Sequence, residues 1–311
     1  MKKNLLLFAN VFAALALAYV FLSSAGLSGV AERFSGLRAE WLALGGLLYA
    51  GMNLLNSFRI AWTLKTNWTA KLFFQHMTAM LVSDFTPGRA GYAAMVQKLR
   101  VTGVKGGPAA KSLGVLFIAD FLARALLAVF AVAYFGSTIK SDFFVWAAGV
   151  LLALGAGGWF LLAYKNGWLE RTLNRVPMVG KRLARMYAGA VALDVKAGFL
   201  AANVGLSLVG AAFRGAAWTM AFVALGLGGF EVFPAATLVS ALVTVASFIP
   251  VSLAGVGVQE GLGAYLFSAA LALPISAAAA VMVACRVMEF GTDALLGWRE
   301  LLTGWRKKDA T

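Results

Sequence analysis

The sequence has few charged residues, one cysteine and one histidine. Only 13% of its 311 residues are charged, and its single cysteine and histidine are Cys285 and His76. One cysteine excludes an internal disulfide framework and a cysteine-based metal cluster, and one histidine excludes a histidine-rich metal site, so we expect no cofactor. Soluble chains carry about 25% charged residues, which excludes a cytosolic enzyme, a disordered tail and a soluble nucleic-acid binder.

The low content of charged residues is matched by a high content of apolar ones, since 61% of the chain is hydrophobic. This composition predicts an all-α integral membrane protein, because every backbone group in hydrocarbon needs an internal partner and the sequence lacks the alternating pattern of a membrane barrel. The expected apolar segments are 5–22, 41–64, 72–98, 112–136, 143–164, 197–227, 236–273 and 276–298. The first follows Lys2 and Lys3 and is long enough to be a retained span rather than a signal peptide.

Two of these segments are interrupted. Segment 72–98 contains Pro87 and Gly88, and segment 236–273 contains Pro250, Gly255 and Gly257. Proline removes a backbone donor and glycine weakens a helix, so we expect each segment to bend back at its interruption.

The basic residues predict the topology. The connections 2–3, 65–71, 98–111, 165–196 and 299–311 carry 19 Lys and Arg with 4 acids, whereas 24–40, 137–142 and 227–235 carry 3 with 4 acids. By the positive-inside rule the first group is cytoplasmic, in a cytoplasmic (inner) membrane, with both termini inside. Both flanks of each interrupted segment then lie on one side, which gives six spans and two re-entrant hairpins. We expect the basic loop 165–196 to lie on anionic lipid headgroups.

The interruptions also mark an inverted repeat within one transmembrane domain. Each half has a span with an arginine, a hairpin, and a span with an arginine and an acid three or four residues apart, as in secondary transporters. The expected divisions are 1–40 for the first span and outer loop, 41–136 for the first repeat, 137–196 for a linking span and basic loop, 197–298 for the second repeat and 299–311 for the cytoplasmic tail.

Ten charges lie within the apolar segments, and all five cations are arginine. They are Arg59, Arg89, Arg124, Arg214 and Arg286 with Asp84, Asp120, Glu260, Glu289 and Asp293. Arginine has a planar fork that suits phosphate or carboxylate, and a half-helix after a hairpin break points its positive N-terminus into the membrane. We therefore expect the arginines, with Ser252 and Glu260, to bind an anionic group, and the other acids to pair with them.

Other interpretations of these charges stay open. Asp120 with Arg124, and Arg286 with Glu289, are spaced to neutralise each other within one helix. Arg59 and Arg214 have no such neighbour, so they bind substrate, snorkel to the interface, or pair with a distant acid such as Asp84 or Asp293. His76 lies near the expected inner interface, which favours an interfacial residue over a proton relay.

The two interruptions resemble the paired signatures of the flippase-like family related to the transmembrane domain of lysylphosphatidylglycerol synthase. That family has Pro-Gly-Arg-x-Gly-Glu and Pro-x-x-x-Gly-Gly-x-Gly-x-x-Glu. The matching residues are Pro87, Gly88, Arg89, Gly91, Pro250, Gly255, Gly257 and Glu260, while Tyr92 and Ala254 depart from the pattern. The resemblance implies lipid translocation. The aminoacyl-transfer domain of the synthases is not expected, because no soluble segment here is long enough to form it.

The leading hypothesis is a flippase that moves an anionic or zwitterionic lipid, such as a phospholipid or a polyprenyl phosphate, through an arginine-lined cavity. A small-anion carrier would use the same arginines. An intramembrane enzyme acting on lipid phosphates is disfavoured, because the sequence lacks the motifs that activate a nucleophile or hold a metal. The membrane lipid is the expected partner, and a homo-oligomer stays open.

Overall fold

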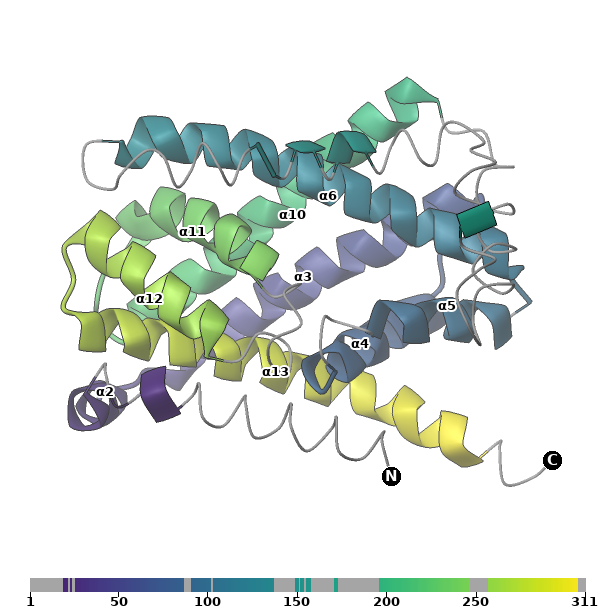
Figure 1. Cartoon of the computed structure of the whole chain (residues 1–311). Coiled ribbons are helices and arrows are strands. Elements are labelled where there is room, and N and C mark those ends of the chain that lie inside the picture. Colours follow the sequence, from purple (N-terminus) through teal and green to yellow (C-terminus); the bar gives the residue numbers. More distant parts are fainter. Residues whose placement is uncertain are drawn as a thin grey trace.

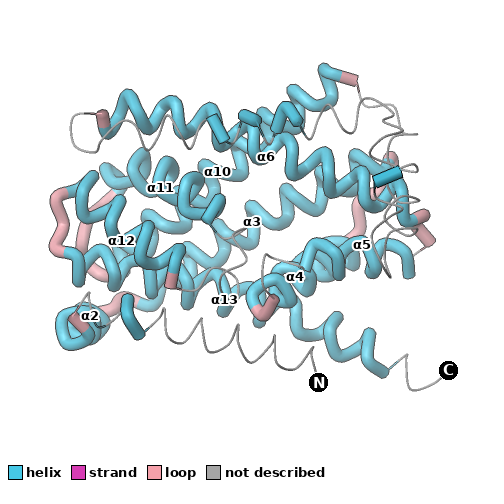
Figure 2. Tube along the Cα trace, viewed as in Figure 1, coloured by secondary structure: helices cyan, strands magenta, loops and turns pink. Residues whose placement is uncertain are grey.

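The computed structural model describes residues 19–21, 23, 26–86, 91–101, 103–136, 149–150, 152–153, 155–157, 171–172, 196–246 and 257–306. Within these ranges the chain forms helices joined by short loops, with no strand (Figure 2). The helices are α2 (Leu27–Phe34), α3 (Ala39–Leu64), α4 (Ala70–Asp84), α5 (Gly91–Val101), α6 (Gly106–Phe135), α10 (Ala197–Ala224), α11 (Phe233–Ala246), α12 (Val258–Leu271) and α13 (Ile275–Arg306), with a 3-10 turn, η1, at Phe230–Val232.

Four long helices, α3, α6, α10 and α13, run along the length of the molecule (Figure 1). Three stretches, Gly106–Phe135, Ala197–Ala224 and Ile275–Trp298, are long and apolar enough to cross a membrane. Large apolar side chains such as Leu47, Phe130 and Leu295 are exposed on the outside of these helices, where lipid would cover them. The expected all-helical membrane fold is therefore confirmed.

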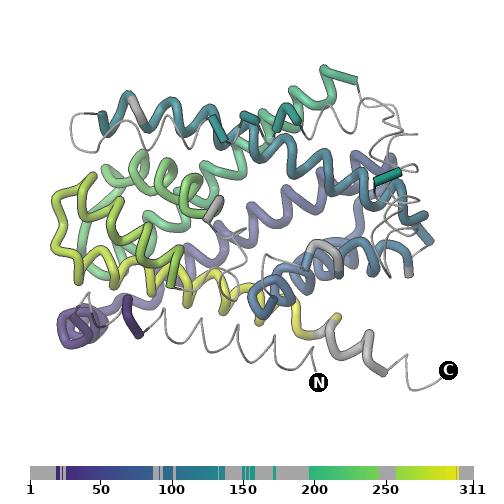
Figure 3. The backbone as a smooth tube through the Cα atoms, viewed as in Figure 1, coloured from purple at the N-terminus to yellow at the C-terminus, as the bar shows by residue number. Residues whose placement is uncertain are grey.

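Two helical hairpins occupy opposite ends of this bundle. Helices α4 and α5 form the first, and α11 and α12 form the second. In each pair the outer helix ends lie at one end of the molecule, whereas the C-terminal ends of α4 and α11 and the N-terminal ends of α5 and α12 lie toward its middle (Figures 1 and 3). The helices end before the predicted interruptions, at Asp84 and Ala246, and resume at Gly91 and Val258. Residues 87–90 and 247–256 lie outside the described residues, so the breaks expected at Pro87 and Pro250 stay predictions.

Local chemistry explains where the hairpin helices begin. The Thr69 hydroxyl accepts a hydrogen bond from the Leu72 backbone N–H at 3.2 Å and caps α4. At the start of α12, Gly257 has a φ of 84°, a left-handed conformation that favours glycine. Its backbone N–H donates to the Glu260 carboxylate at 2.6 Å, so this acid holds the first turn of α12.

Small residues allow the helices to pack closely around the middle of the molecule. A methyl group on Gly91 would overlap the Ala79 carbonyl oxygen and the Ser83 hydroxyl, where α5 lies against α4. A methyl on Gly215 of α10 would overlap Thr237 of α11. Close backbone approach at small residues is typical of membrane helices, which gain no hydrophobic driving force from one another in lipid.

The spans predicted at 5–22 and 143–164, and the basic loop 165–196, lie mostly outside the described residues. The remaining predicted segments coincide with helices, and the ends differ by a few residues. The largest differences are α13, which continues to Arg306 rather than 298, and α6, which begins at Gly106 rather than 112 because Pro108 is tolerated in the first turn of a helix.

Candidate functional site

A cavity opens among α3, α6, α10 and α11 in the middle of the bundle. Its empty space, including open solvent at its entrance, is about 820 Å³. Arg59, Arg124 and Arg214 all line it, each from a different helix. Its other polar lining residues are Tyr49, Asn53, Asn56, Asp120, Ser207, Ser240 and Thr244, and Met52, Met80, Phe117, Phe121 and Leu127 contribute apolar surface. Three of the five predicted arginines therefore converge on one site.

Arg59 is buried and held by five hydrogen bonds. Its Nε donates to the Asn203 Oδ1 at 3.2 Å, and its Nη2 donates to the Asn203 carbonyl at 3.3 Å and the Ser207 hydroxyl at 2.7 Å. Its Nη1 donates to the Asn56 Oδ1 at 2.9 Å and the Asp120 carboxylate at 3.1 Å. The side chain is 1% exposed, and its hydrogen bonds link α3 to α6 and α10.

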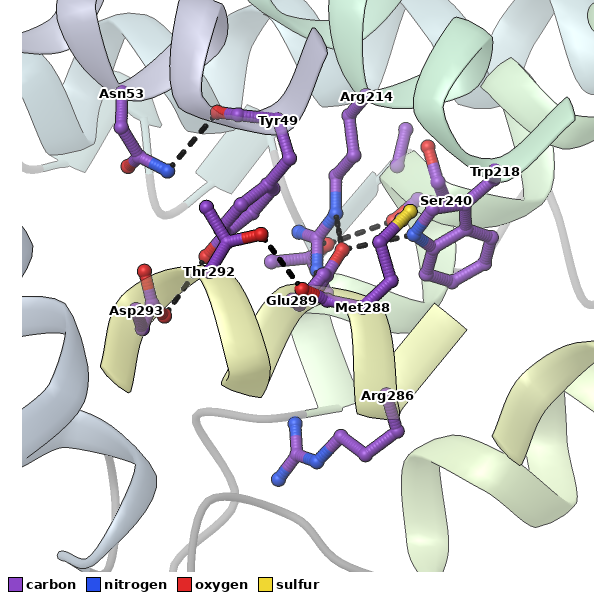
Figure 4. Close-up of polar contacts among 12 residues, drawn as sticks. Tyr49, Asn53, Arg214, Trp218, Ser240, Arg286, Met288, Glu289, Thr292 and Asp293 are labelled. Carbon is purple, nitrogen blue, oxygen red and sulfur yellow. Dashed lines mark hydrogen bonds and ion pairs between the residues drawn. The ribbon is translucent and has the colours of Figure 1, made fainter. Parts of the chain in front are cut away.

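Arg214 forms a two-pronged ion pair with Glu289 across α10 and α13. Its Nε and Nη2 donate to the two carboxylate oxygens at 2.8 and 2.6 Å (Figure 4). The Trp218 indole N–H donates to the same carboxylate at 2.8 Å, and the Arg214 Nη1 donates to the Thr244 hydroxyl at 2.6 Å. Paired, hydrogen-bonded burial is the condition under which such charges are tolerated in a low-dielectric interior.

Arg124 and Asp120 are the more accessible charges of the cavity. The Arg124 Nη1 donates to the Ala241 carbonyl oxygen at 3.3 Å and so joins α6 to α11. The Asp120 side chain is 27% exposed and accepts from Arg59 at 3.1 Å and from the Ser207 hydroxyl at 2.6 Å. One helix therefore places a cation and an acid at the cavity wall four residues apart, with the acid oriented by α3 and α10.

Tyr49 and Asn53 of α3, which also line the cavity, form a second set of polar contacts. The Tyr49 hydroxyl donates to the Asp293 carboxylate of α13 at 3.1 Å, and the Asn53 amide donates to the Tyr49 backbone carbonyl at 3.1 Å. The Asn53 Oδ1 lies 3.2 Å from the His76 Nε2 of α4. His76 is 2% exposed, and its ring packs inside the protein. The expectation that it lies near the inner membrane interface stays a prediction.

Arg286 occupies a separate, smaller pocket. This pocket has about 210 Å³ of empty space, and Trp218, Gln259, Glu260 and Glu289 also line it. The Arg286 Nε lies 3.6 Å from the Glu260 carboxylate, and the side chain points away from the Arg214–Glu289 pair (Figure 4). Arg286 of α13 thus faces the start of α12. Its pocket is separate from the main cavity that the other three arginines line.

The remaining predicted site residues divide into two groups. Asp84 is the last residue of α4, half-buried, and its charge acts on Tyr49 together with those of Asp293 and Glu289. Arg89, Ser252, Pro87, Gly88, Pro250 and Gly255 lie outside the described residues.

Neutral polar residues of the site were missed by the charge pattern. Asn53, Asn56 and Asn203 orient the charged groups. Their signal in the sequence is the rarity of amides within apolar helices, where each needs an internal partner. Among the described side chains, no group of three or more His, Cys, Asp or Glu could hold a metal ion.

Comparison with known proteins assigns the chain to a family. The family model of the lysylphosphatidylglycerol synthase transmembrane region matches residues 6–297, which include both hairpins and every cavity residue. No curated protein matches the chain. The resemblance first seen in the two interruptions is thus confirmed, and the chain is an integral membrane protein that belongs to the family of the lysylphosphatidylglycerol synthase transmembrane region.

Proposed function

We propose that this protein is a flippase that moves a lipid with a phosphate- or carboxylate-bearing headgroup between the two leaflets. The observation that carries the proposal is the convergence of Arg59, Arg124 and Arg214 on one cavity with a partly apolar wall. The headgroup enters the cavity while the lipid tail stays in the bilayer. The family, which is named for a lipid-related protein, supports a lipid as the substrate.

The cavity lowers the barrier that opposes translocation. Moving a charged headgroup through about 30 Å of hydrocarbon is costly because the group loses its water. Preorganised guanidinium groups, amides and hydroxyls replace that water at mid-depth. No bond in the lipid has to be made or broken, so we propose transport rather than catalysis.

The acids prevent the headgroup from binding too tightly. Arg59 and Arg214 already hold Asp120 and Glu289, so an anion competes with these carboxylates rather than meeting bare cations. When the headgroup leaves, the ion pairs form again. A transport site needs this balance, because an anion held by three uncompensated arginines would not be released.

The same proposal includes the topology. The hairpin helices have 11 to 15 residues and are at most about 23 Å long, which is shorter than the hydrocarbon core. We propose that both hairpins are re-entrant, that the chain makes six full spans as an inverted repeat, and that both termini face the cytoplasm. Two re-entrant hairpins give each leaflet its own approach to the central cavity.

Reconstitution into liposomes tests the function. Headgroup-labelled anionic, zwitterionic and polyprenyl-phosphate lipids are placed in both leaflets, and a membrane-impermeant quencher reports exchange. We expect the protein to accelerate exchange of at least one class, Arg124→Ala to slow it about tenfold or more, and Arg124→Lys to restore it in part, since lysine lacks the fork. Arg33→Ala, an exposed arginine of α2, is the control.

The outcome also separates the alternatives. Exchange no faster than in empty liposomes for every lipid, together with uptake of a soluble anion, would identify a small-anion carrier. Conversion of the lipid to a new chemical species would identify an enzyme.

A further inference from the structure

His76, the only histidine of the chain, lies one side chain behind the cavity wall. It belongs to α4 of the first hairpin and is 2% exposed. Asn53 of α3 stands between it and the cavity, because Asn53 lines the cavity and its Oδ1 lies 3.2 Å from the ring Nε2.

Hydrogen bonding fixes which ring nitrogen carries the proton. The Asn53 Nδ2 donates to the Tyr49 carbonyl at 3.1 Å, a bond drawn in Figure 4, so the amide oxygen faces the histidine. An amide oxygen only accepts hydrogen bonds, so the Nε2 must be the donor. In the neutral ring the Nδ1 is then a bare lone pair. It is buried and has no hydrogen-bond partner among the described residues. A buried imidazole nitrogen with a free lone pair can accept one proton.

The charged residues around the ring couple the protonation of Nδ1 electrostatically to the cavity. Burial is the largest effect that opposes a second ring proton; Arg59 of α3 also opposes it, and Asp120 of α6 favours it. Of the other helices packed against α4, α13 carries Asp293, which accepts from Tyr49, and α5 carries Lys98 and Arg100 in its last turn. Arg59 and Asp120 both line the cavity, so an anion bound there acts on the ring through the same field.

We infer that His76 binds a proton at Nδ1 when an anionic headgroup occupies the cavity, so that the lipid and a proton bind together. The inference rests on the proposed function and names its coupling ion. The proton comes from the aqueous phase and adds to the Nδ1 lone pair. The charge that the headgroup brings is then compensated by one imidazolium, and the pair enters and leaves without adding net charge to a low-dielectric interior.

Linkage makes the inference quantitative. If the anion raises the proton affinity of His76, protonation of His76 must raise the anion affinity by the same factor. Where uptake reaches one proton per anion, the affinity rises about tenfold for each unit that the pH falls. Binding of a ligand whose own charge is constant over this range should therefore strengthen as the pH falls.

Calorimetry on the purified full chain tests the inference. The probe is dihexanoylphosphatidylglycerol, a short-chain lipid whose phosphodiester keeps a single negative charge across the range. Titrations at pH 6.5 and 7.5 in two buffers of different ionisation heat give the number of protons taken up per bound lipid. For the wild type we expect a clear uptake, up to about one proton, and tighter binding at pH 6.5.

Two variants locate the proton. His76→Gln keeps an N–H near the position of Nε2 but has no basic atom, so binding should lose its proton uptake and its pH dependence. Asn53→Asp places a carboxylate against the Nε2–H and holds the ring protonated before the lipid arrives, so uptake should also fall toward zero. Thr78→Ser, two residues away on α4, keeps its hydroxyl for the Gly297 carbonyl and should match the wild type.

The possible results separate a failure of this inference from a failure of the proposed function. Lipid binding without proton uptake in the wild type overturns the inference and leaves the flippase proposal standing. Unchanged uptake in His76→Gln also overturns it, because the proton then resides on another group such as Asp120. Failure of the wild type to bind any lipid counts against the proposed function itself.

Discussion

Glu289 of α13 binds Arg214 of α10 with both carboxylate oxygens, at 2.8 and 2.6 Å, and Arg214 itself lines the cavity. The Trp218 indole adds a third donor at 2.8 Å. The acid is therefore a structural anchor for α13 and also a competitor for the arginine that a substrate would need.

Removal of one partner of this pair should be strongly destabilising. We expect Arg214→Leu to cost about 3–5 kcal/mol of unfolding free energy, because Glu289 then stays buried without its cation. The double variant Arg214→Leu with Glu289→Leu should recover most of that loss. Thermal unfolding of the three proteins in mild detergent measures the difference, and a double variant as unstable as the single one would contradict the explanation.

Arg124 and Arg59 should differ in how they affect stability and transport. Arg59 is 1% exposed with five hydrogen bonds, so Arg59→Gln should mainly reduce the yield of folded protein. Arg124 is half-buried at the cavity wall, so Arg124→Gln should slow lipid exchange and leave the unfolding temperature nearly unchanged. Exchange and unfolding measured on the same preparations check this. Similar loss of stability in both variants would make Arg124 structural as well.

Cysteine labelling should place the hairpin flanks. In a background where the buried Cys285 is replaced by alanine, Lys71→Cys and Val104→Cys flank the first hairpin, and Phe230→Cys and Ile275→Cys flank the second. We expect the first two to react with an impermeant reagent from the cytoplasm and the other two from outside. If Lys71→Cys and Val104→Cys react from opposite sides, the first hairpin crosses the membrane and the inverted repeat is wrong.

Gly91 should tolerate no side chain. A methyl there would overlap the Ala79 carbonyl oxygen and the Ser83 hydroxyl, so Gly91→Ala should separate α4 from α5 and cost about 1–3 kcal/mol. The control is Gly205→Ala in α10, whose added methyl meets nothing within 4 Å. That change should stabilise its helix by up to about 1 kcal/mol. Equal unfolding temperatures for the two variants would show that the hairpin is not closely packed.

The sequence predicted the helices because apolar length acts locally. It also predicted that arginines would converge on one site, because charged residues within membrane segments face the protein interior or a water-filled cavity. It did not predict their partners. Acids four residues away along one helix were the simplest candidates, yet Asp120 binds Arg59 and Glu289 binds Arg214 across helices. Which helix faces cross depends on packing of small residues such as Gly215, and that information is not contained in spacing along the chain.

Helix α13 contacts both hairpins. Near one end the Thr78 hydroxyl of α4 donates to the Gly297 carbonyl at 2.8 Å, and near the other the Arg286 side chain faces Glu260 of α12. A helix of 32 residues is about 48 Å long and stiff, so α13 moves as one rigid element in contact with both hairpins. A tilt that frees the hairpin at one end presses on the hairpin at the other. If the protein is the flippase proposed above, we expect this coupling to oppose widening at both ends at once and so to keep a lipid passage from becoming a continuous leak for ions.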